Sequence, residues 1–259
     1  MHKISVLMPA YNEEKYLFRS VTTTAKELAG LPYEIIIIND GSSDNTEEVA
    51  FELSRKYKNI KVISYKKNHG KGYALREGFK KSEGDLIVFL DADLDIHPNQ
   101  IHRFIRAIKK GYDIVIGSKY LPGARVNYTF KRWLFSILYR KLVKVLLSLD
   151  VSDTQVGLKV FRREVLENVF PRITVKRYAF DVELLTVASM SGYRIKEIPI
   201  KIEHKNHNSS IDISAILKMF IDTMAIYYRK NILQYYSGGT HEDIMAQLEG
   251  YRAPRSGRR

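Results

Sequence analysis

The feature that most constrains this chain is the alternation of short apolar runs with helical patterns along its first 120 residues. The runs are rich in isoleucine and valine and predict strands, while the segments between them carry apolar residues at helical spacing. Such alternation predicts βαβ units and an α/β fold, a mostly parallel sheet flanked by helices. The predicted strands are residues 4–9, 34–40, 60–65, 85–91 and 113–118, and the predicted helices are residues 13–29, 45–57, 71–81 and 99–109.

Neither of two loops that could carry a common nucleotide-binding fingerprint has the required pattern. The loop after the first predicted strand, PAYNEE (9–14), has no glycine and therefore lacks the G-x-G-x-x-G pattern of dinucleotide-binding folds. The stretch HGKGYALREG (69–78) has Gly70, Lys71 and Gly72 but lacks the spacing and the Ser/Thr of a P-loop. Both fingerprints are absent.

The stretch LIVFLDADLDIHPNQ (86–100) leads an apolar run into three aspartates, Asp91, Asp93 and Asp95. The run predicts a strand buried on both faces, and open parallel sheets bind their ligands outside the carboxyl ends of the strands. Crowded carboxylates repel one another unless a cation neutralises them. The cluster therefore predicts a divalent metal site.

Clustered aspartates also occur in calcium loops and at helix starts. An EF-hand calcium loop begins Asp-x-Asp-x-Asp, but it requires glycine and glutamate where this chain has Ile96 and His102. Asp95 and its neighbours can instead cap a helix that begins near Pro98, since Asp and Pro are common at helix starts. Capping explains one aspartate and not all three.

The composition predicts one domain with anionic partners. No Gly/Pro/Ser-rich linker divides the 259 residues, of which 45% are hydrophobic. The net charge of +13 predicts nucleic acid, a membrane surface or phosphorylated substrates as partners. The chain has no cysteine, which suits a reducing compartment or a hot one, and it has no signal-peptide pattern and no apolar stretch of about twenty residues. We expect a cytoplasmic location without a spanning helix, peripheral at the cytoplasmic face of a membrane.

The chain contains, in this order, PAYNEE (9–14), INDGSSDNT (38–46), NHGKGYALREG (68–78), FLDADLD (89–95) and GSKYLPG (117–123). These segments resemble those of the inverting glycosyltransferases of family two. The resemblance covers about residues 3–200. It implies the Rossmann-like GT-A fold and an enzyme that transfers a hexose from a nucleotide-sugar donor.

Two further segments, DTQVGLKVFRREV (153–165) and YAFDVELL (178–185), are similar to the polyprenyl-phosphate sugar synthases of that family. They are most like dolichyl-phosphate β-glucosyltransferases, which implies UDP-glucose as donor and dolichyl or polyprenyl phosphate as acceptor. A mannosyltransferase using GDP-mannose is the alternative. The Gln-x-x-Arg-Trp element of processive synthases is absent, because Thr129 stands where glutamine is required before Trp133.

The resemblance implies roles for the donor-site residues. Asp91 contacts the ribose or the metal, Asp93 binds Mg²⁺ or Mn²⁺, and Asp95 stands where some relatives use glutamine as a further ligand. The cation neutralises the departing nucleoside diphosphate. The implied nucleotide-sugar pocket contains Pro9, Tyr11, Glu13, Asp40, Lys71, Asp91, Ala92 and Lys119.

Several of these residues also suit purely structural roles. Glu13 and Glu14 can place favourable charge at a helix N-terminus, and NDGSSD (39–44) can form an ordinary turn with a helix cap. Lys119 stands where relatives have arginine, and a lysine lacks the two-pronged fork needed for bidentate contact.

The acceptor decides whether a catalytic base is needed. A phosphomonoester is mostly dianionic at neutral pH, so transfer to a polyprenyl phosphate needs no base. A sugar hydroxyl needs one, and Asp181 is then the candidate beside Asp91 and Asp93. Otherwise Asp181 and Glu183 hold basic residues in place. Lys131 and Arg132 stand where relatives place a cation for phosphate, or else form a solvated helix start.

Two C-terminal segments are amphipathic. Residues 130–149 are apolar around much of a helix but carry five basic residues, which suits a helix at the membrane surface or one packed on the domain or in a dimer. Residues 213–231 place an apolar stripe on one helical face that covers the sheet, the membrane or a second subunit. The expected organisation is a glycosyltransferase domain over 1–210, an amphipathic helix over 211–236 and a variable basic tail over 237–259. The stripe consists of Ile213, Leu217, Phe220, Met224 and Tyr227.

A nucleic-acid-binding protein is the alternative from a different class, motivated by the positive charge and the Arg-rich tail. The basic residues are spread over many elements, and no recognised nucleic-acid-binding motif is present. We therefore expect no nucleic-acid partner.

Overall fold

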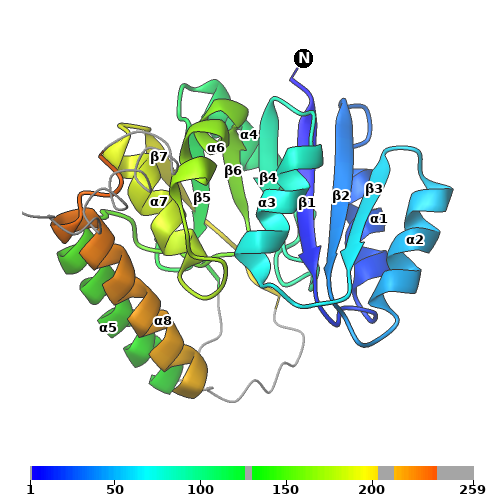
Figure 1. Cartoon of the computed structure of the whole chain (residues 1–259). Helices are drawn as coiled ribbons and strands as arrows, with labels where there is room; N and C mark the ends of the chain where they lie inside the picture. Colours follow the sequence, from blue (N-terminus) through cyan, green and yellow to red (C-terminus); the bar gives the residue numbers. More distant parts are fainter. Residues whose placement is uncertain (1, 126–129, 204–212, 238–259) are drawn as a thin grey trace, which may run out of the picture.

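The computed structural model describes residues 2–125, 130–203 and 213–237, with the side chains of residues 130–135 and 213 outside the described part. A seven-stranded sheet runs in the order β3-β2-β1-β4-β6-β5-β7 (Figure 1). β6 is antiparallel to both of its neighbours, and the other strand pairs are parallel. The predicted α/β fold with a mostly parallel sheet is confirmed.

Strands and helices alternate along the chain as far as β5. The strands are β1 (Ile4–Ala10), β2 (Tyr33–Asp40), β3 (Ile60–Tyr65), β4 (Leu86–Phe89), β5 (Ile114–Ser118), β6 (Lys159–Arg162) and β7 (Ile195–Pro199). The α-helices are α1 (Leu17–Glu27), α2 (Thr46–Lys56), α3 (Lys71–Lys81), α4 (Ile101–Lys109), α5 (Phe130–Leu147), α6 (Arg163–Val169), α7 (Phe180–Met190) and α8 (Ile213–Tyr227).

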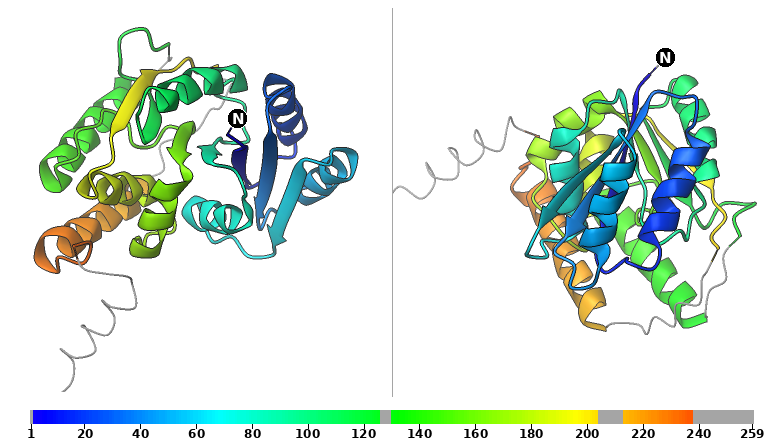
Figure 2. Two further views of the ribbon diagram at one scale, coloured as in Figure 1. Left: turned by 90° about the horizontal axis from the view of Figure 1, so that it is seen from above. Right: turned by 90° about the vertical axis from the view of Figure 1, so that its right-hand side faces the viewer.

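Each face of the sheet has its own hydrophobic core, with helices on both sides (Figure 2). Because strand side chains alternate, Leu7 of β1 packs with α3, α6 and α7, whereas Val6 and Met8 pack with α1, α2 and α4. The central residues 35–38 of β2 are fully buried, as expected for a parallel strand covered on both faces. The two cores fix the sheet edge on which the functional loops lie.

One predicted boundary is wrong. The helix predicted to begin at Glu13 begins at Leu17, because the residues before it form a turn held against the start of α2. Asn12 has a positive φ of 57°, and the backbone amide of Glu13 donates to the Thr46 hydroxyl at 2.8 Å. The other boundaries of the elements predicted in the first 120 residues lie within two residues of those observed.

β6 and β7 were not predicted. β6 is four residues long and contains Lys159 and Arg162, so it lacks the uniform apolarity of β4, the buried strand of the same length. It nevertheless lies between β4 and β5 in the sheet, with its first three residues buried. The sequence pattern therefore missed a strand of the sheet interior.

α5 and α8 form a pair beside the sheet, where the Tyr139 hydroxyl of α5 lies 2.9 Å from the Thr223 hydroxyl of α8 (Figure 1). α8 continues into a π-helical turn, Tyr228–Ile232. Within the described ranges, no helix combines the length and the apolar composition that crossing a bilayer requires. The predicted tail over 237–259 lies, apart from Ser237, outside the described residues.

Candidate functional site

The loops that carry the predicted donor site meet at the carboxyl edge of the sheet. β1 pairs with β2 on one side and with β4 on the other, both in parallel register. The loops that follow these strands therefore emerge at one edge, which is where open α/β sheets bind ligands. Residues 11–14, 41–46 and 91–95 are brought together there.

Two of these loops contain a residue other than glycine in the left-handed conformation. Asn12 has φ 57° and Leu94 has φ 61°. Asn12 is held by the loop of residues 41–46. Its side-chain oxygen accepts from the backbone amide of Ser43 at 2.8 Å, and its own backbone amide donates to the Ser42 hydroxyl at 3.0 Å. Left-handed backbone is sparsely populated away from glycine and clusters at functional sites.

The three aspartates follow β4, as predicted. Lys71 at the start of α3 pairs with Asp91, with Nζ 2.5 Å from Oδ1. The Asp95 amide donates to the Asp93 carboxylate at 2.9 Å, which folds the loop onto itself. Asp95 Oδ1 is buried and makes no hydrogen bond with the described part of the chain. That oxygen is an acceptor suited to a ligand.

Glu13 joins this cluster from the first loop. Burial, followed by the charges of Asp93 and Asp91, raises the pKa of Glu13 from 4.5 to about 7. Burial, followed by the charge of Asp91, raises the pKa of Asp93 from 3.8 to about 6. These carboxylates therefore repel one another when all of them are ionised near neutral pH. A bound cation would reduce this repulsion.

The residues fit a hard divalent cation. All the donors in the cluster are carboxylate oxygens, the ligand type that Mg²⁺ and Mn²⁺ prefer. Among the described residues, no group of three or more His, Cys, Asp or Glu side chains is arranged to hold a metal ion by itself. Mg²⁺ typically takes one or two carboxylates and completes its shell with substrate phosphate and water. Such a site would be completed by ligands from outside the protein.

Gly157, just before β6, makes room for Asp91. A Cβ atom at Gly157 would lie 2.3 Å from Asp91 Oδ2, far inside van der Waals contact. Any side chain there would push the Asp91 carboxylate away from Lys71. The glycine of the segment DTQVGLKV is therefore part of the architecture of the site.

Lys159 is a site residue that the sequence interpretation missed. It is 1% exposed in β6, and its Nζ lies 2.8 Å from Asp181 Oδ1 at the start of α7. Burial lowers the pKa of Lys159, and the Asp181 carboxylate offsets only part of that effect. Burial also acts to lower the pKa of Lys71, but Asp91 and Asp181 outweigh it and the net shift is upward. A lysine within the apolar stretch VGLKVF was the available signal.

Asp181 and Glu183 both hold basic side chains. The Asp181 side chain is 10% exposed and faces Lys159. Glu183 is fully buried and accepts from Arg229 at 2.9 Å and from the Thr174 amide at 2.8 Å. This geometry fits the role in which Asp181 and Glu183 hold basic residues in place, rather than the role of Asp181 as a catalytic base.

The predicted nucleoside pocket is only partly open. Tyr11 is 50% exposed, and Pro9 is partly buried at the end of β1. Asp40 is 3% exposed, and its two carboxylate oxygens accept the backbone amides of His69 at 2.8 Å and Gly70 at 2.7 Å. Asp40 thus positions the loop that leads into Lys71, a role that the sequence did not predict.

A groove lies between the loop after β5 and the α5–α8 pair. It has a volume of about 370 Å³. At one side, the buried Asp153 carboxylate lies 3.6 Å from Lys119 Nζ and accepts the Lys119 amide at 3.2 Å. Arg140 of α5 stacks on the Tyr120 ring at 3.7 Å, so it faces the protein. Apolar residues contributed by α5 and α8 are Leu138, Leu142, Ile216, Met219 and Phe220.

The remaining predicted residues divide into two groups. Ala92 is 3% exposed between the aspartates. Lys131 and Arg132 lie in the first turn of α5, and their side chains lie outside the described part of the chain. Their predicted contact with a phosphate remains a prediction.

Comparisons with known proteins agree with this fold. A family described as Glycosyl transferase family 2 matches residues 5–170. A dolichyl-phosphate beta-glucosyltransferase of Trichomonas vaginalis is 32% identical over 247 residues, which cover 88% of this chain and 75% of the relative. A dolichol-phosphate mannosyltransferase of Pyrococcus furiosus is 41% identical over 171 residues, which cover 64% of this chain and 48% of the relative.

Solved structures with the same fold include glucosyl-3-phosphoglycerate synthase from Mycobacterium tuberculosis in complex with uridine diphosphate. It superimposes with a TM-score of 0.68 at 20% identity, covering 93% of this chain and 82% of the other. A complex of the same synthase with Mn²⁺, UDP-glucose and phosphoglyceric acid has a TM-score of 0.65 at 20% identity and covers 93% and 81%. At this identity the likeness establishes the fold alone.

Proposed function

Because this chain belongs to glycosyl transferase family 2, we propose that it transfers a hexose, glucose from UDP-glucose, to a dolichyl or other polyprenyl phosphate. The observation that carries the proposal is the carboxylate cluster beside Lys71 at the carboxyl edge of the sheet, next to a groove bounded by two amphipathic helices. The names of the relatives support the reaction class, and two of them are glucosyltransferases. Mannosyl transfer from GDP-mannose is the second candidate, supported by the name of the Pyrococcus furiosus relative.

In the proposed mechanism, Asp93 and Asp95 would hold Mg²⁺ or Mn²⁺, and the cation would supply positive charge against the diphosphate that departs with the nucleoside. Lys71 stabilises the same negative charge and keeps Asp91 in place through its ion pair. Pro9, Tyr11, Glu13 and Ala92 surround the nucleoside, with the exposed Tyr11 ring available to pack on the base or ribose. Asp40 holds the loop that leads into Lys71 beside it.

The acceptor phosphate attacks the anomeric carbon on the face opposite the departing nucleotide. One displacement inverts the configuration, so an α-linked donor gives a β-linked lipid product. The phosphate is already dianionic and gives up no proton in the attack, so no general base is required. The buried contact of Asp181 with Lys159 supports this acceptor over a sugar hydroxyl, because a general base must be within reach of its proton.

The groove beside Lys119 receives the phosphate end of the acceptor, and its apolar wall follows the first part of the polyprenyl chain. Lys131 and Arg132 add positive charge at the entry. The exposed apolar residues of α5 and α8, among them Leu138, Val145 and Leu217, support attachment of these helices to the cytoplasmic surface of a membrane. The enzyme is then peripheral and takes its acceptor directly from the bilayer.

The test measures transfer of radiolabelled sugar from UDP-glucose and, separately, from GDP-mannose into extractable polyprenyl phosphate. Each reaction is run with Mg²⁺, with Mn²⁺ and with EDTA. We expect metal-dependent labelling from UDP-glucose, its loss in Asp93→Asn and its retention in Asp150→Asn, a matched change at an 86% exposed side chain. Labelling that persists fully in EDTA would overturn the metal role. Absence of lipid labelling from both donors, with nucleotide binding intact, would overturn the acceptor.

A further inference from the structure

A second cleft lies on the face of the molecule that carries α3 and α7, next to α8. Its volume is about 610 Å³. Three segments form it: residues 67–69 before α3, residues 174–178 before α7, and one face of α8 with the turn that follows. None of the residues assigned to the donor, the metal or the acceptor lines it. We call it the basic cleft.

The basic cleft has an excess of positive charge. Four of its basic side chains make no ion pair with any carboxylate in the described ranges, namely Lys67, Lys176, Arg177 and Lys218. A fifth, Arg229, pairs with Glu183 behind the cleft. The single carboxylate in the lining is Asp222, whose pKa is raised, first by burial. An anionic ligand would therefore meet several unneutralised cations.

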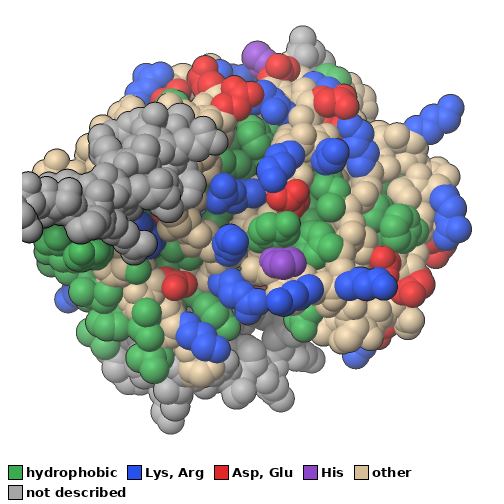
Figure 3. All heavy atoms as spheres, in the orientation of Figure 1, with side chains coloured by type: hydrophobic (Ala, Val, Ile, Leu, Met, Phe, Trp, Pro, Cys, Tyr) green, Lys and Arg blue, Asp and Glu red, His purple; other side chains and the backbone are tan. Residues whose placement is uncertain are grey.

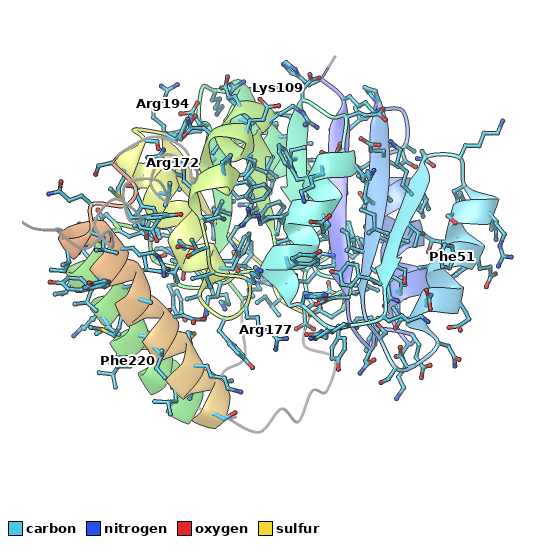
Figure 4. The ribbon with its side chains drawn as sticks, viewed as in Figure 1. Phe51, Lys109, Arg172, Arg177, Arg194 and Phe220 are labelled. Carbon is cyan, nitrogen blue, oxygen red and sulfur yellow. The ribbon has the colours of Figure 1, made fainter. Side chains whose placement is uncertain are left out.

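The walls of the basic cleft are tied together. Arg177 donates to the Asn68 carbonyl at 2.9 Å, which joins the first two segments. The Lys176 carbonyl accepts the Gly72 amide at 2.9 Å, and Lys218 Nζ lies 5.9 Å from the centre of the Tyr178 ring. These contacts hold the segments that carry the cations against one another. A ligand would therefore not have to order a loop when it binds. Figure 4 shows Arg177 at the lower edge of the molecule, between α3 and α8.

α8 places the basic cleft beside an apolar surface. Its cleft-lining positions recur at helical spacing, from Lys218 to Arg229. Roughly a third of a turn away at about 100° per residue, α8 and the π-helical turn after it carry an apolar stripe that is exposed in the described part of the chain. Figure 3 shows basic side chains across the lower half of this face, next to hydrophobic side chains over α5 and α8. The stripe consists of Leu217, Ile221, Met224 and Tyr228, which are 58%, 56%, 37% and 51% exposed.

We propose that the basic cleft binds the phosphate headgroup of an anionic phospholipid, which is neither donor nor acceptor. A bilayer that receives the apolar stripe at its acyl chains brings its headgroups level with the cleft, where lysine and arginine pair with phosphate. The proposal rests on the membrane attachment proposed above and adds a defined lipid class to it. The adjoining apolar stripe favours a lipid phosphate over a free phosphate ion.

The experiment compares three forms of the full chain, each with its tail. They are the wild type, a cleft variant and a control variant with the same loss of charge at exposed lysines far from the cleft, such as Lys109 at the opposite edge (Figure 4). Binding is measured by co-sedimentation with vesicles of phosphatidylcholine alone and with vesicles that also contain phosphatidylglycerol, at constant ionic strength. The cleft variant is Lys67→Gln, Lys176→Gln and Lys218→Gln; the control is Lys26→Gln, Lys58→Gln and Lys109→Gln.

We expect phosphatidylglycerol to strengthen wild-type binding by about tenfold or more. The cleft variant should lose most of this gain, and the control variant should keep most of it. Equal losses in the two variants, or none in the cleft variant, would overturn the basic cleft as the site.

Two further outcomes separate this inference from the proposed function. If the wild type binds both kinds of vesicle equally well, membrane attachment stands and the headgroup site fails. If it binds neither, both fail. If the wild type binds inorganic phosphate in the absence of vesicles, the cleft variant does not, and phosphatidylglycerol brings no gain in vesicle binding, free phosphate is the ligand and the lipid is overturned.

Discussion

Lys159 lies in a buried strand, where a charged lysine is unfavourable unless an opposite charge lies beside it. Asp181 provides the opposite charge, and the side chains are 1% and 10% exposed. Breaking a buried ion pair by removing one partner leaves an uncompensated charge, whereas replacing both partners can be nearly neutral. The Asp181 carboxylate also acts to raise the pKa of Lys71, so the pair lies within electrostatic reach of that lysine. We infer that it positions Lys71 and Asp91.

Lys159→Met should lower the free energy of unfolding by about 3 to 5 kcal/mol, because Asp181 is left as a buried, unpaired charge. The double variant Lys159→Met with Asp181→Leu should recover most of this loss. Urea unfolding of the two single variants and the double variant measures the coupling. A single variant as stable as the wild type, or a double variant no better than the sum of the singles, would contradict the structural pairing.

Glu13 should make the metal-free protein less stable as the pH rises. Its folded pKa of about 7 lies above its unfolded value of 4.5, so the folded state binds the proton more tightly. The resulting stabilisation is fully present below pH 4.5 and is lost as the pH rises through about 7. We expect the unfolding free energy in EDTA to fall across this window and Glu13→Gln to flatten the profile. An unchanged slope in Glu13→Gln would show that other groups titrate.

At the scale of elements, α8 has one face packed on the protein and another exposed to solvent. One face packs on α5 and the core through Thr223 and Ile226, both fully buried. Of the stripe predicted from the sequence, Leu217, Phe220 and Met224 are exposed, whereas Tyr227 is partly buried against the core. The predicted single stripe is therefore divided between the solvent side and the protein.

Ile221→Ser tests the exposed side. Ile221 is 56% exposed in the free protein, so the change should alter the unfolding free energy by less than about 0.5 kcal/mol. If the stripe enters a membrane, the same change should weaken binding to phosphatidylcholine vesicles by about tenfold. Phe51→Ser on α2, 43% exposed and far from α8 (Figure 4), is the control and should not affect vesicle binding. Equal effects of the two changes would exclude α8 as the attachment surface.

At the scale of the whole molecule, the candidate metal site is assembled from several loops. Asp93, Asp95 and Glu13 come from two loops, and Lys71 opposes their charge from a helix start. The described carboxylates form no complete metal site, so in the proposed function the donor's diphosphate would supply the missing ligands.

Mn²⁺ should therefore bind at least about tenfold more tightly when UDP is present, since phosphate oxygens complete the coordination shell. Titration calorimetry with and without UDP measures this coupling independently of turnover. Asp93→Asn should abolish the UDP-dependent part and leave nucleotide binding weaker but measurable. Mn²⁺ that binds equally tightly without nucleotide would show that the protein holds the ion by itself.

The sequence by itself determined the βαβ half of the sheet. The β3 and α3 boundaries match the prediction to the residue, and the three aspartates follow β4 as expected. The order of five short segments also identified the family correctly. These features are local, because strand and helix periodicity and loop sequence are written within windows of about ten residues.

Only the tertiary structure decided which distant residues meet. It inserted β6 between β4 and β5, brought Lys159 onto Asp181, and placed Glu13 near Asp93. It also joined residues 67–69, 174–178 and α8 around the basic cleft. The physical reason is that these contacts depend on strand order and helix packing. Periodicity reports which face of an element is buried, but it carries no information about which element lies against that face.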